Sequence, residues 1–353
     1  MINDNVVDVQ ISVTKASNSA TRFGHMLIIG PTPTNPGATS VPEVAAFDIN
    51  DISTQLKKAG FGETDVIYKA AQKVATAAIP ADVVYIAIQK SADSGLEDIA
   101  STMQRAIDYT NDFWAVCPVG IGDADLQKLA EFIETVEPGI FMDVASTKIS
   151  DTVITGQYER TRVIHQTDDA DYANVGEMAA MLSHAPGSAT FQFLNIPGLD
   201  AQSLTQSEIN AMEKNNTACY VSLYGKNCVY GGKTVSGEWA DTILFKDWLV
   251  DRIQRKVSGL FVKLDKVPYT DAGITMIQSN MISALEEGRT AGGIADDETD
   301  DDGNIIPGFT TSVPRGRALD EAKRAQRVLE SCTFEARLAG AIHSVTVRGN
   351  LVS

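Results

Sequence analysis

The stretch GGKTVSGEWADTILFKDWLVDRIQRKVSGLFVKLDKVPYTDAGITMIQSNMISALEEGRTAGG, residues 231–293, decides the expected fold of the second half of the chain. It contains two helical patterns on either side of a proline-bearing turn. In the first pattern, from about residue 238 to 261, apolar side chains recur at spacings of three and four, so they share one broad face. These side chains are Trp239, Ile243, Leu249, Val250, Ile253, Val257 and Leu260.

The second helical pattern follows Val267-Pro268-Tyr269. Thr270 or Asp271 can cap its start, and Gly288 can end it. Its apolar stripe consists of Ile274, Ile277, Met281, Ala284 and Leu285. The stretch therefore predicts a pair of amphipathic helices, and it contains no recognisable catalytic constellation.

Strand and helix patterns alternate upstream of this stretch. Short apolar runs predict strands at residues 25–29, 66–68, 83–88, 113–117, 140–144, 162–165 and 191–194. Helical spacing predicts helices at residues 50–59, 126–136 and 171–182. A further helix follows the capping-box pair Ser94 and Glu97, with Leu96, Ile99, Met103 and Ile107 on one face. The alternation predicts an open α/β layer with a largely parallel sheet over residues 21–195.

Both ends of the chain carry short strand patterns. The alternating apolar residues are Val7, Val9, Ile11 and Val13 near the start, and Val345 and Val347 near the end. A lone strand with unpaired backbone groups is unstable until it pairs. The two ends are therefore candidate arms, which pair either within their own subunit or with the sheet of another subunit.

The composition narrows the function classes. The 353 residues include 29 Lys and Arg against 46 Asp and Glu, a net charge of −17, which argues against nucleic-acid binding by phosphate neutralisation. The start of the chain lacks the apolar core of a signal peptide, and no apolar run reaches the ~20 residues of a membrane span. The four cysteines form no C-x-x-C pair and are expected to be the reduced thiols of an intracellular protein: Cys117, Cys219, Cys228 and Cys332.

Two binding patterns are incomplete. Gly232-Lys233-Thr234 ends like a phosphate-binding loop, but Asn227 stands where that loop needs a glycine, so a plain turn is expected. An acidic loop matches the first half of an EF-hand, although Phe309 replaces its twelfth-position glutamate. Its candidate calcium ligands are Glu298, Asp300 and Asp302. The alternative interpretation is a solvated loop without a metal.

No arrangement of catalytic residues is recognised. Three carboxylates that could act as acids or bases each lie near a predicted helix start, where the helix dipole stabilises them. They are Glu238, Asp241 and Asp271. The histidines lie far apart and outside any known catalytic motif: His25, His165, His184 and His343. We therefore expect no catalytic residue and no cofactor.

Several residues of the stretch quoted first form a recognisable set: Gly232, Gly237, Glu238, Asp241, Trp248, Pro268, Tyr269 and Gly273. Together with Phe334-x-Ala336-Arg337-Leu338-Ala339-Gly340-Ala341-Ile342-His343, this set resembles a family of phage proteins long labelled a domain of unknown function. That family is assigned to the contractile tail sheath group. The resemblance is specific over about residues 219–353 and diffuse over residues 20–195.

The resemblance implies an α/β fold with an inner sheath-type domain, an outer open α/β domain, and terminal arms that donate strands to neighbouring subunits. It places the N-terminal arm at residues 1–20, the outer domain at 21–200, the inner domain at 201–332 and the C-terminal arm at 333–353. Such a subunit forms stacked hexameric rings around a tail tube and contracts to drive the tube through a cell envelope.

The implied location is a virion tail assembled in a bacterial host cytoplasm. The implied partners are other copies of the chain, the tail tube protein, and baseplate and tail terminator proteins, without direct nucleic-acid contact. Two other functions stay open. Residues 21–195 could form a doubly wound enzyme domain that binds a small molecule beyond its strand ends. The chain could also be a non-contractile tail or coat component.

Overall fold

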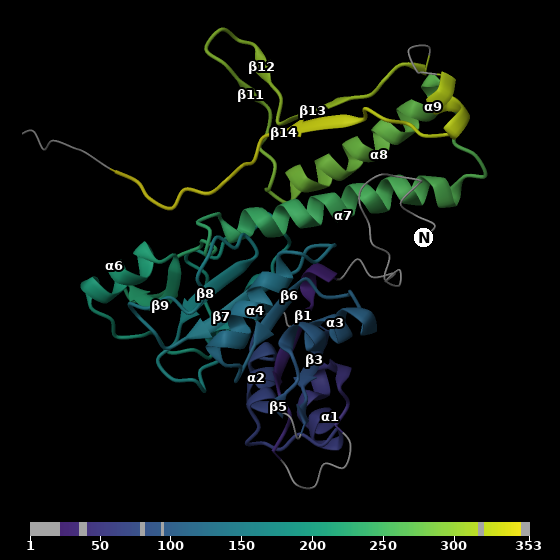
Figure 1. Cartoon of the computed structure of the whole chain (residues 1–353). Helices are drawn as coiled ribbons and strands as arrows, with labels where there is room; N and C mark the ends of the chain where they lie inside the picture. The colour runs from purple at the N-terminus through teal and green to yellow at the C-terminus, as the bar shows by residue number, and fades with distance from the viewer. Residues whose placement is uncertain (1–21, 35–40, 78–81, 93–94, 317–320, 347–353) are drawn as a thin grey trace, which may run out of the picture. The chain divides into compact units, whose positions relative to one another are not determined.

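The protein was studied as a computed structural model, which describes residues 22–34, 41–77, 82–92, 95–316 and 321–346. The chain divides into two compact units, unit 1 with residues 1–254 and unit 2 with residues 255–353. Helix α7, Ala240–Lys263, begins in unit 1 and continues into unit 2 (Figure 1). Among the described residues, we find no helix with the length and apolar character of a membrane span.

Unit 1 is built on an eight-stranded sheet with the order β10-β9-β8-β7-β6-β1-β3-β2. Neighbouring strands from β9 to β3 are parallel, and β10 and β2 pair antiparallel at the two ends of the order. The bounds are β1 Met26–Pro31, β2 Val44–Asp48, β3 Val83–Gln89, β6 Ala115–Pro118, β7 Phe141–Ser146, β8 Thr161–His165, β9 Thr217–Leu223 and β10 Lys226–Tyr230. The expected open, largely parallel sheet is confirmed.

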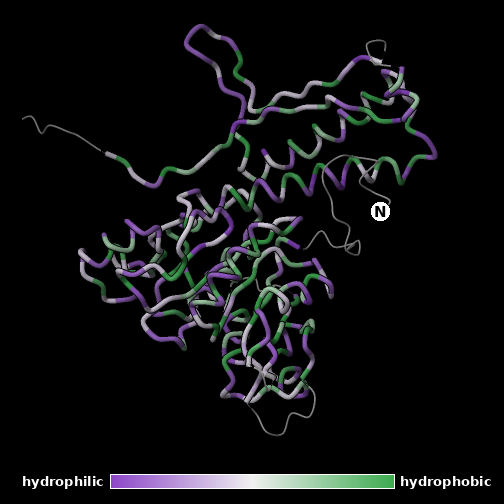
Figure 2. The backbone as a smooth tube through the Cα atoms, viewed as in Figure 1, coloured by the Kyte–Doolittle hydropathy of each residue, from purple (hydrophilic) through white to green (hydrophobic). Residues whose placement is uncertain are grey.

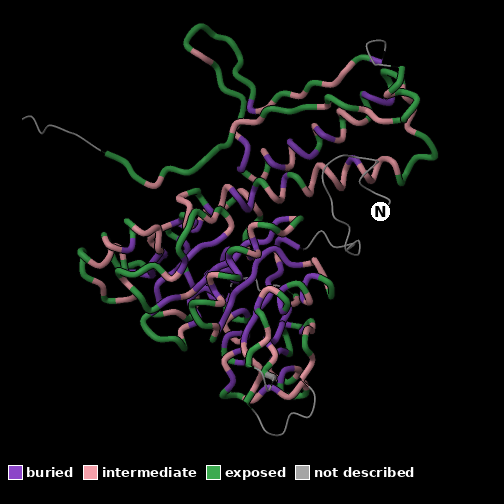
Figure 3. The backbone as a smooth tube through the Cα atoms, viewed as in Figure 1, coloured by how far each residue is buried: buried purple, intermediate pink, exposed green. Residues whose placement is uncertain are grey.

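Helices cover both faces of this sheet, so its strands are buried on both sides (Figures 1 and 3). Successive side chains of a strand point to opposite faces. Met26 and Ile28 of β1 accordingly join the core beneath α1, α2 and α5, while Leu27 and Ile29 join the core beneath α3 and α4. A sheet covered on both faces needs continuous apolar runs, which the hydropathy of the strands shows in Figure 2.

The helices of unit 1 before α7 are short. Their bounds are α1 Ile52–Lys58, α2 Val66–Val74, α3 Ile99–Tyr109, α4 Asp123–Ile133, α5 Ala173–Leu182 and α6 Gln206–Lys214, with 3-10 turns η1 Arg22–Gly24 and η2 Ile49–Asp51. A capping box of Thr205 and Glu208 starts α6, as the spacing of these two residues indicated.

The strand predicted at residues 66–68 is wrong, because these residues begin helix α2. The buried side chains of α2 follow helical spacing: Ile67, Tyr68, Ala70, Ala71 and Val74. The helix packs against β1 and α5. Three apolar residues are too few to show the helical period of 3.6 residues. Burial of α2 against β1 and α5 outweighs the β propensity of its first turn.

Helix α3 begins later than predicted. Asp98 is its N-cap, and the Asp98 carboxylate accepts a hydrogen bond from the Ser101 amide. The predicted cap, Ser94, lies outside the described residues. Leu96 lies in a short pair of strands, β4 Ser91–Ala92 and β5 Gly95–Leu96, and is exposed. The rest of the predicted face is buried as expected: Ile99, Met103 and Ile107.

The strand predicted at residues 191–194 is also wrong, because this segment forms turns. The Phe193 amide donates to the Val229 carbonyl and the Val229 amide donates to the Leu194 carbonyl, each at 2.8 Å. Phe193 has a φ of 68°, which breaks the extended path that a strand requires. The segment therefore covers the outer side of β10 at one residue without extending the sheet.

Unit 2 begins with a helical hairpin made of the end of α7 and helix α8, Asp271–Thr290. Lys256 on α7 contacts Glu287 at 2.6 Å and Ser283 at 3.0 Å on α8, so the two helices are antiparallel. The predicted stripe of α8 is largely buried, namely Ile274, Met281, Ala284 and Leu285. Gly288 lies inside the helix and does not end it.

In the described residues after α8 lie β11 Glu298–Thr299, β12 Ile305–Ile306, β13 Phe309–Ser312, α9 Glu321–Gln326 and β14 Thr333–Ala336. β11 pairs with β12, and β13 with β14, both antiparallel. Residues 304–314 contain β12 and β13. β14, the partner of β13, follows α9 in the chain, so no local sequence pattern could predict the pairing.

Most of the predicted arm residues lie outside the described residues, namely Val7, Val9, Ile11, Val13 and Val347. Val345 is described, is 78% exposed and belongs to no strand among the described residues. The sheet of unit 1 continues past residue 200 to Tyr230, which was assigned to the inner domain. The arms and the division into outer and inner domains stay predictions.

Candidate functional site

The Gly-Lys-Thr segment forms a closed turn between β10 and α7. The Thr234 amide donates to the Glu238 carbonyl at 2.8 Å. A Cβ atom on Gly232 would lie 3.1 Å from the Trp239 ring, so glycine fits here with the least displacement. The Lys233 ammonium lies 5.4 Å from the centroid of the same ring, within cation–π range. The segment is thus a packed turn whose lysine lies over an aromatic side chain.

A fully buried arginine links this turn to the sheet. Arg162 on β8 donates hydrogen bonds to the Glu177 carboxylate on α5 and to the Gly231 carbonyl. Its guanidinium lies 4.8 Å from the centroid of the Phe191 ring. Asp143 on β7 lies 3.9 Å from the same guanidinium, and all three charged side chains are fully buried. We call Arg162, Asp143 and Glu177 the buried charge cluster.

Burial raises the pKa of Asp143 well above its usual range, and the neighbouring Glu177 charge raises it further. Both Asp143 carboxyl oxygens lack a hydrogen-bond partner among the described residues, which favours the neutral acid. Burial also raises the pKa of Glu177, although the Arg162 charge opposes this. A neutral Asp143 acid, the Glu177 carboxylate and the Arg162 guanidinium together give a cluster without net charge.

A second ion pair fixes the first half of α7. Asp247 accepts hydrogen bonds from both Nη atoms of Arg160, at 2.7 and 3.0 Å, and from Nε1 of Trp114 at 2.8 Å. Its side chain is only 11% exposed. Its spacing from the apolar residues of the first helical pattern predicts that Asp247 lies on the opposite, polar face, and the structure shows that this prediction is wrong. The two donors turn it inward because together they satisfy the buried carboxylate.

Three residues of the set that resembles the sheath family, Pro268, Tyr269 and Gly273, shape the turn before α8. A Cβ atom on Gly273 would collide with the Pro268 carbonyl, so the close approach requires glycine. The Tyr269 hydroxyl donates to the Val328 carbonyl at 2.6 Å. Asp271 accepts a hydrogen bond from the Gly316 amide at 2.6 Å, so this carboxylate holds the incoming chain. The turn therefore positions the segments on both sides of α9.

The other matching residues have structural positions as well. Gly237 has a φ of 96°, in the region that favours glycine. Asp241 lies in the first turn of α7, as expected for an acid at a helix start, and Glu238 lies just before that turn and is exposed. The Trp248 ring stacks on Phe245, with 5.8 Å between centroids.

The three candidate calcium ligands have other partners. Glu298 contacts Arg337 at 2.9 Å. The Asp300 carboxylate accepts hydrogen bonds from the amides of Asp302 and Asn304, which shape the turn between β11 and β12. Over the described ranges, no group of three or more His, Cys, Asp or Glu side chains is placed to hold a metal ion.

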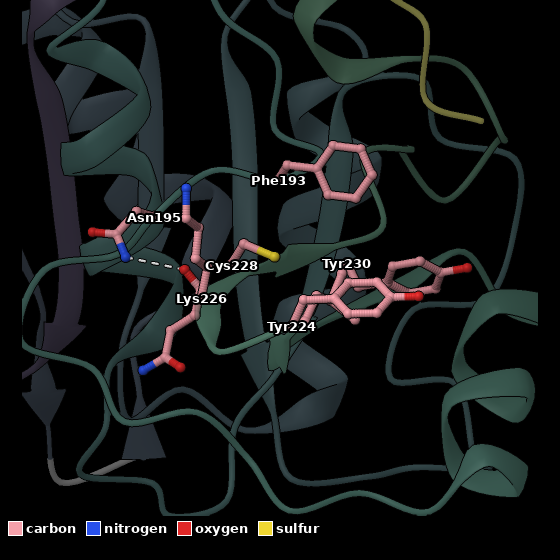
Figure 4. Close-up of a pocket in the computed structure, with 8 residues that line it drawn as sticks. Phe193, Asn195, Tyr224, Lys226, Cys228 and Tyr230 are labelled. Carbon is pink, nitrogen blue, oxygen red and sulfur yellow. Dashed lines mark hydrogen bonds between the residues drawn. The ribbon is translucent and has the colours of Figure 1, made fainter. Parts of the chain in front are cut away.

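An open, mainly apolar pocket of about 830 Å³ lies beside the hairpin of β9 and β10. Phe193, Tyr224 and Tyr230 expose their rings there, and Asn195 donates to the Asn227 carbonyl at 3.1 Å (Figure 4). Burial raises the pKa of the Cys228 thiol in the same pocket, which makes it a poor nucleophile. The pocket offers contact area rather than reactive groups.

A doubly wound enzyme holds its ligand at the strand ends where the sheet order reverses. β1 lies between β3 and β6, so the sheet order reverses there. A Cβ atom on Gly30, near the end of β1, would lie 2.7 Å from Ile67 and 3.0 Å from Val119. Of the histidines, His25 lies next to the Asp112 carbonyl and His165 next to Gln202.

Residues 240–351 match the model of a family described as the C-terminal domain of tail sheath proteins like gp31 of E217. We call residues 240–351 the tail sheath domain, after the family whose model they match. It contains α7, α8 and both short sheets of unit 2. The resemblance stated from the sequence is thereby confirmed. A search of curated proteins found no match.

The fold of the tail sheath domain and of the rest of the chain is shared with solved sheath structures. The sheath of an extracellular contractile injection system, PVC, in its contracted state is similar with a TM-score of 0.67 at 11% identity, covering 98% of this chain and 96% of that chain. The contracted helical sheath of the anti-feeding prophage gives 0.64 at 10% identity, covering 98% and 99%.

A crystal structure of a sheath tail protein from Desulfitobacterium hafniense gives a TM-score of 0.56 at 11% identity, covering 84% of this chain and 92% of that chain. Identities this low show a common fold only. They cover nearly the full length of the chain, so unit 1 belongs to the shared fold along with the tail sheath domain.

Sequence reasoning missed the two buried ionic arrangements. The members of the buried charge cluster are 15 to 34 residues apart, and Asp247 is 87 residues from Arg160, so no local pattern connects them. Arg162 and Asp143 do lie within apolar strand runs. A charged residue inside such a run is the one signal that could have indicated buried partners.

We expect Asp247→Ala to lower the free energy of unfolding of the protein by about 3 kcal/mol, because it leaves the Arg160 guanidinium buried without its partner. Urea denaturation followed by circular dichroism measures this change. Glu63→Ala removes one member of an exposed pair with Lys57 and serves as the control, with no measurable change expected. Equal midpoints for Asp247→Ala and Glu63→Ala would contradict the assigned role of Asp247.

The buried charge cluster predicts a pH dependence. The pKa of Asp143 is raised in the folded state, so folding retains a proton that the unfolded chain releases above about pH 4. Its stabilising contribution is complete below that pH and is lost as the pH rises towards the raised value. Asp143→Asn mimics the protonated acid, so its unfolding free energy should fall less than that of the wild type between about pH 5 and about pH 8. Parallel pH profiles for the two proteins would rule out a protonated Asp143.

Proposed function

We propose that the protein is the sheath subunit of a contractile tail, either of a phage or of a related injection system. Stacked hexameric rings of the subunit surround a tail tube, and their contraction drives the tube through the envelope of a target cell. The observation that carries this proposal is a tail sheath C-terminal domain in a chain that has the sheath fold over 98% of its length.

The terminal arms hold the subunits together in this proposal. An extended arm that adds to another subunit's sheet forms roughly five backbone hydrogen bonds at ~1 kcal/mol each, before side-chain burial. The segment after β14 supports this role, because Val345 is exposed and lies in no strand among the described residues. The N-terminal arm, residues 1–20, carries the second pattern, with Val7, Val9, Ile11 and Val13.

The sheet of β13 and β14 is the acceptor that we propose for these arms. Both strands are four residues long, and an isolated two-stranded sheet is marginally stable in water. One side of it packs on α8, while Phe334 on β14 is 42% exposed. Strands added from neighbouring subunits would complete this sheet and bury Phe334.

The remaining partners follow from the position of a sheath. The inner domain, residues 201–332, faces the tail tube protein, and the outer domain, residues 21–200, faces solvent. The ends of the stack contact baseplate and tail terminator proteins. The particle is assembled in the bacterial cytoplasm and becomes part of the tail. New contacts between subunits drive contraction, so the subunit needs no cofactor, no direct nucleic-acid contact and no enzymatic activity.

Two alternatives predict different results. A small-molecule enzyme would need an open crevice at the reversal of strand order, where Ile67 and Val119 pack against Gly30. A nucleotide panel that raised the melting temperature would support the enzyme. A non-contractile tail or coat component would give assemblies of one length in electron micrographs, whereas a sheath gives striated tubes of two lengths.

Deletion of residues 2–16 should leave a folded subunit that no longer forms tubes, because it removes the N-terminal arm without touching either core. Negative-stain electron microscopy measures tube formation, and the far-ultraviolet spectrum and melting temperature report folding. A matched control replaces residues 2–16 with a scrambled sequence of the same composition, which should also fail to assemble. Long tubes from the deleted protein would disprove the role of the arm.

A further inference from the structure

The pair β11 and β12 forms a projecting hairpin with an unusual surface. β12 exposes two isoleucines, Ile305 at 73% and Ile306 at 38%. Figures 1 and 3 show the hairpin extending from the rest of unit 2 with most of its backbone exposed. We call residues 296–306 the acidic hairpin, after its six carboxylates: Asp296, Asp297, Glu298, Asp300, Asp301 and Asp302.

The base of the acidic hairpin is held firmly. Arg337 donates hydrogen bonds to the Asp296 carbonyl, the Glu298 carboxylate and the Pro307 carbonyl, at 2.9, 2.9 and 3.2 Å, so one guanidinium joins both sides of the hairpin. Asp297 accepts a hydrogen bond from the Gly308 amide at 2.8 Å. The projection is therefore anchored to the sheet of β13 and β14.

The tip of the acidic hairpin is ordered from within. Asp300 accepts hydrogen bonds from the amides of Asp302 and Asn304, and Gly303 has a φ of 85° that closes the turn. This use of Asp300 leaves the side chains of Asp301 and Asp302 exposed at the tip. The hairpin thus presents two carboxylates beside exposed isoleucines, a combination that solvent exposure alone does not favour.

A surface of the opposite kind lies at the end of α7. Val262 is 87% exposed and Leu264 is 39% exposed, next to the exposed cations Lys263 and Lys266. Asp265 is the one carboxylate between them. We call residues 262–266 the lysine patch. Like the acidic hairpin, it combines exposed aliphatic side chains with charge, but its charge is positive.

Further cations lie at the same end of the helical hairpin as the lysine patch. The Arg324 guanidinium lies 5.6 Å from the centroid of the Tyr269 ring, just after the patch in the chain. Arg327, also on the segment of α9, is exposed, whereas Lys323 pairs with Glu330 at 2.6 Å. The surroundings of the patch therefore add positive charge near its lysines.

The two surfaces cannot meet within one subunit. The lysine patch precedes the start of α8, and the acidic hairpin follows its end. A helix of 20 residues is about 30 Å long, at about 1.5 Å per residue. Contact between Lys256 and Glu287 shows that α7 runs back along α8, which keeps the patch at the far end.

We propose that the acidic hairpin of one subunit docks on the lysine patch of a second copy of the chain. Ile305 and Ile306 pack against Val262 and Leu264, and the tip carboxylates face the lysines. Two different surfaces joined in this way make a head-to-tail contact, which builds rings or helical stacks rather than closed dimers. This inference rests on the proposed function, because it assigns one contact within the sheath assembly.

A charge-swap experiment tests the contact on the full chain. We expect Asp301→Lys with Asp302→Lys to raise the protein concentration needed for tube formation about tenfold, because like charges then face each other. Lys263→Glu with Lys266→Glu should have the same effect. A chain that carries all four changes should recover most of the wild-type behaviour, since the pairs are again opposite in sign. Light scattering and electron microscopy measure assembly.

The controls separate this contact from general charge effects. Lys57→Glu changes the charge at an exposed pair on unit 1 and should leave assembly unchanged. Ile305→Ser tests the apolar part and should weaken assembly without altering the melting temperature. One outcome is that the wild type forms tubes while the variant with all four changes assembles no better than either double variant. That result would disprove this contact and leave the sheath proposal standing. If the wild type stays monomeric at all concentrations, both fail together.

Discussion

The buried guanidinium of Arg162 joins the parallel sheet of unit 1 to the turn that precedes α7. A charge without exposure to water must find its partners inside the protein. Arg162 finds them on β7, on α5 and at Gly231, the first residue of the stretch from which the fold was predicted. The turn that launches α7 is thereby fixed to the middle of the parallel sheet. Asp247 on α7 is a second largely buried charge, and it accepts hydrogen bonds from Arg160 and Trp114. The first half of α7 is consequently held against the sheet of unit 1.

Stretches whose signal is local were predicted correctly. The apolar run at residues 26–29, the capping box at Thr205 and the stripe of α8 each carry their own evidence within one or two turns or strand lengths. The strand predicted at residues 66–68 failed because its window was shorter than one helical period. The strand predicted at residues 191–194 failed because backbone bonds to Val229, far along the chain, hold Phe193 in a left-handed conformation. The pairing of β13 with β14 and the buried charge cluster depend on residues that the sequence separates, so no window could contain them.

The site residues show the same division. Gly232, Gly273 and Tyr269 were singled out through a family resemblance, and each proves to fix a turn or a backbone approach in the structure. Their roles in the structure are packing and hydrogen bonding. The surfaces available for assembly lie elsewhere, on the short sheet of β13 and β14 and on the acidic hairpin anchored by Arg337.

In the proposed assembly, copies of the chain exchange their terminal strands. A cryo-electron microscopy map of tubes formed by the full-length protein tests this most directly, because it traces each arm from its own subunit to its partner. The account predicts that the strand around Val9 and the strand around Val345 pair with β13 and β14 of neighbouring subunits. A map in which both arms fold back onto their own subunit, with tubes still formed, would contradict it.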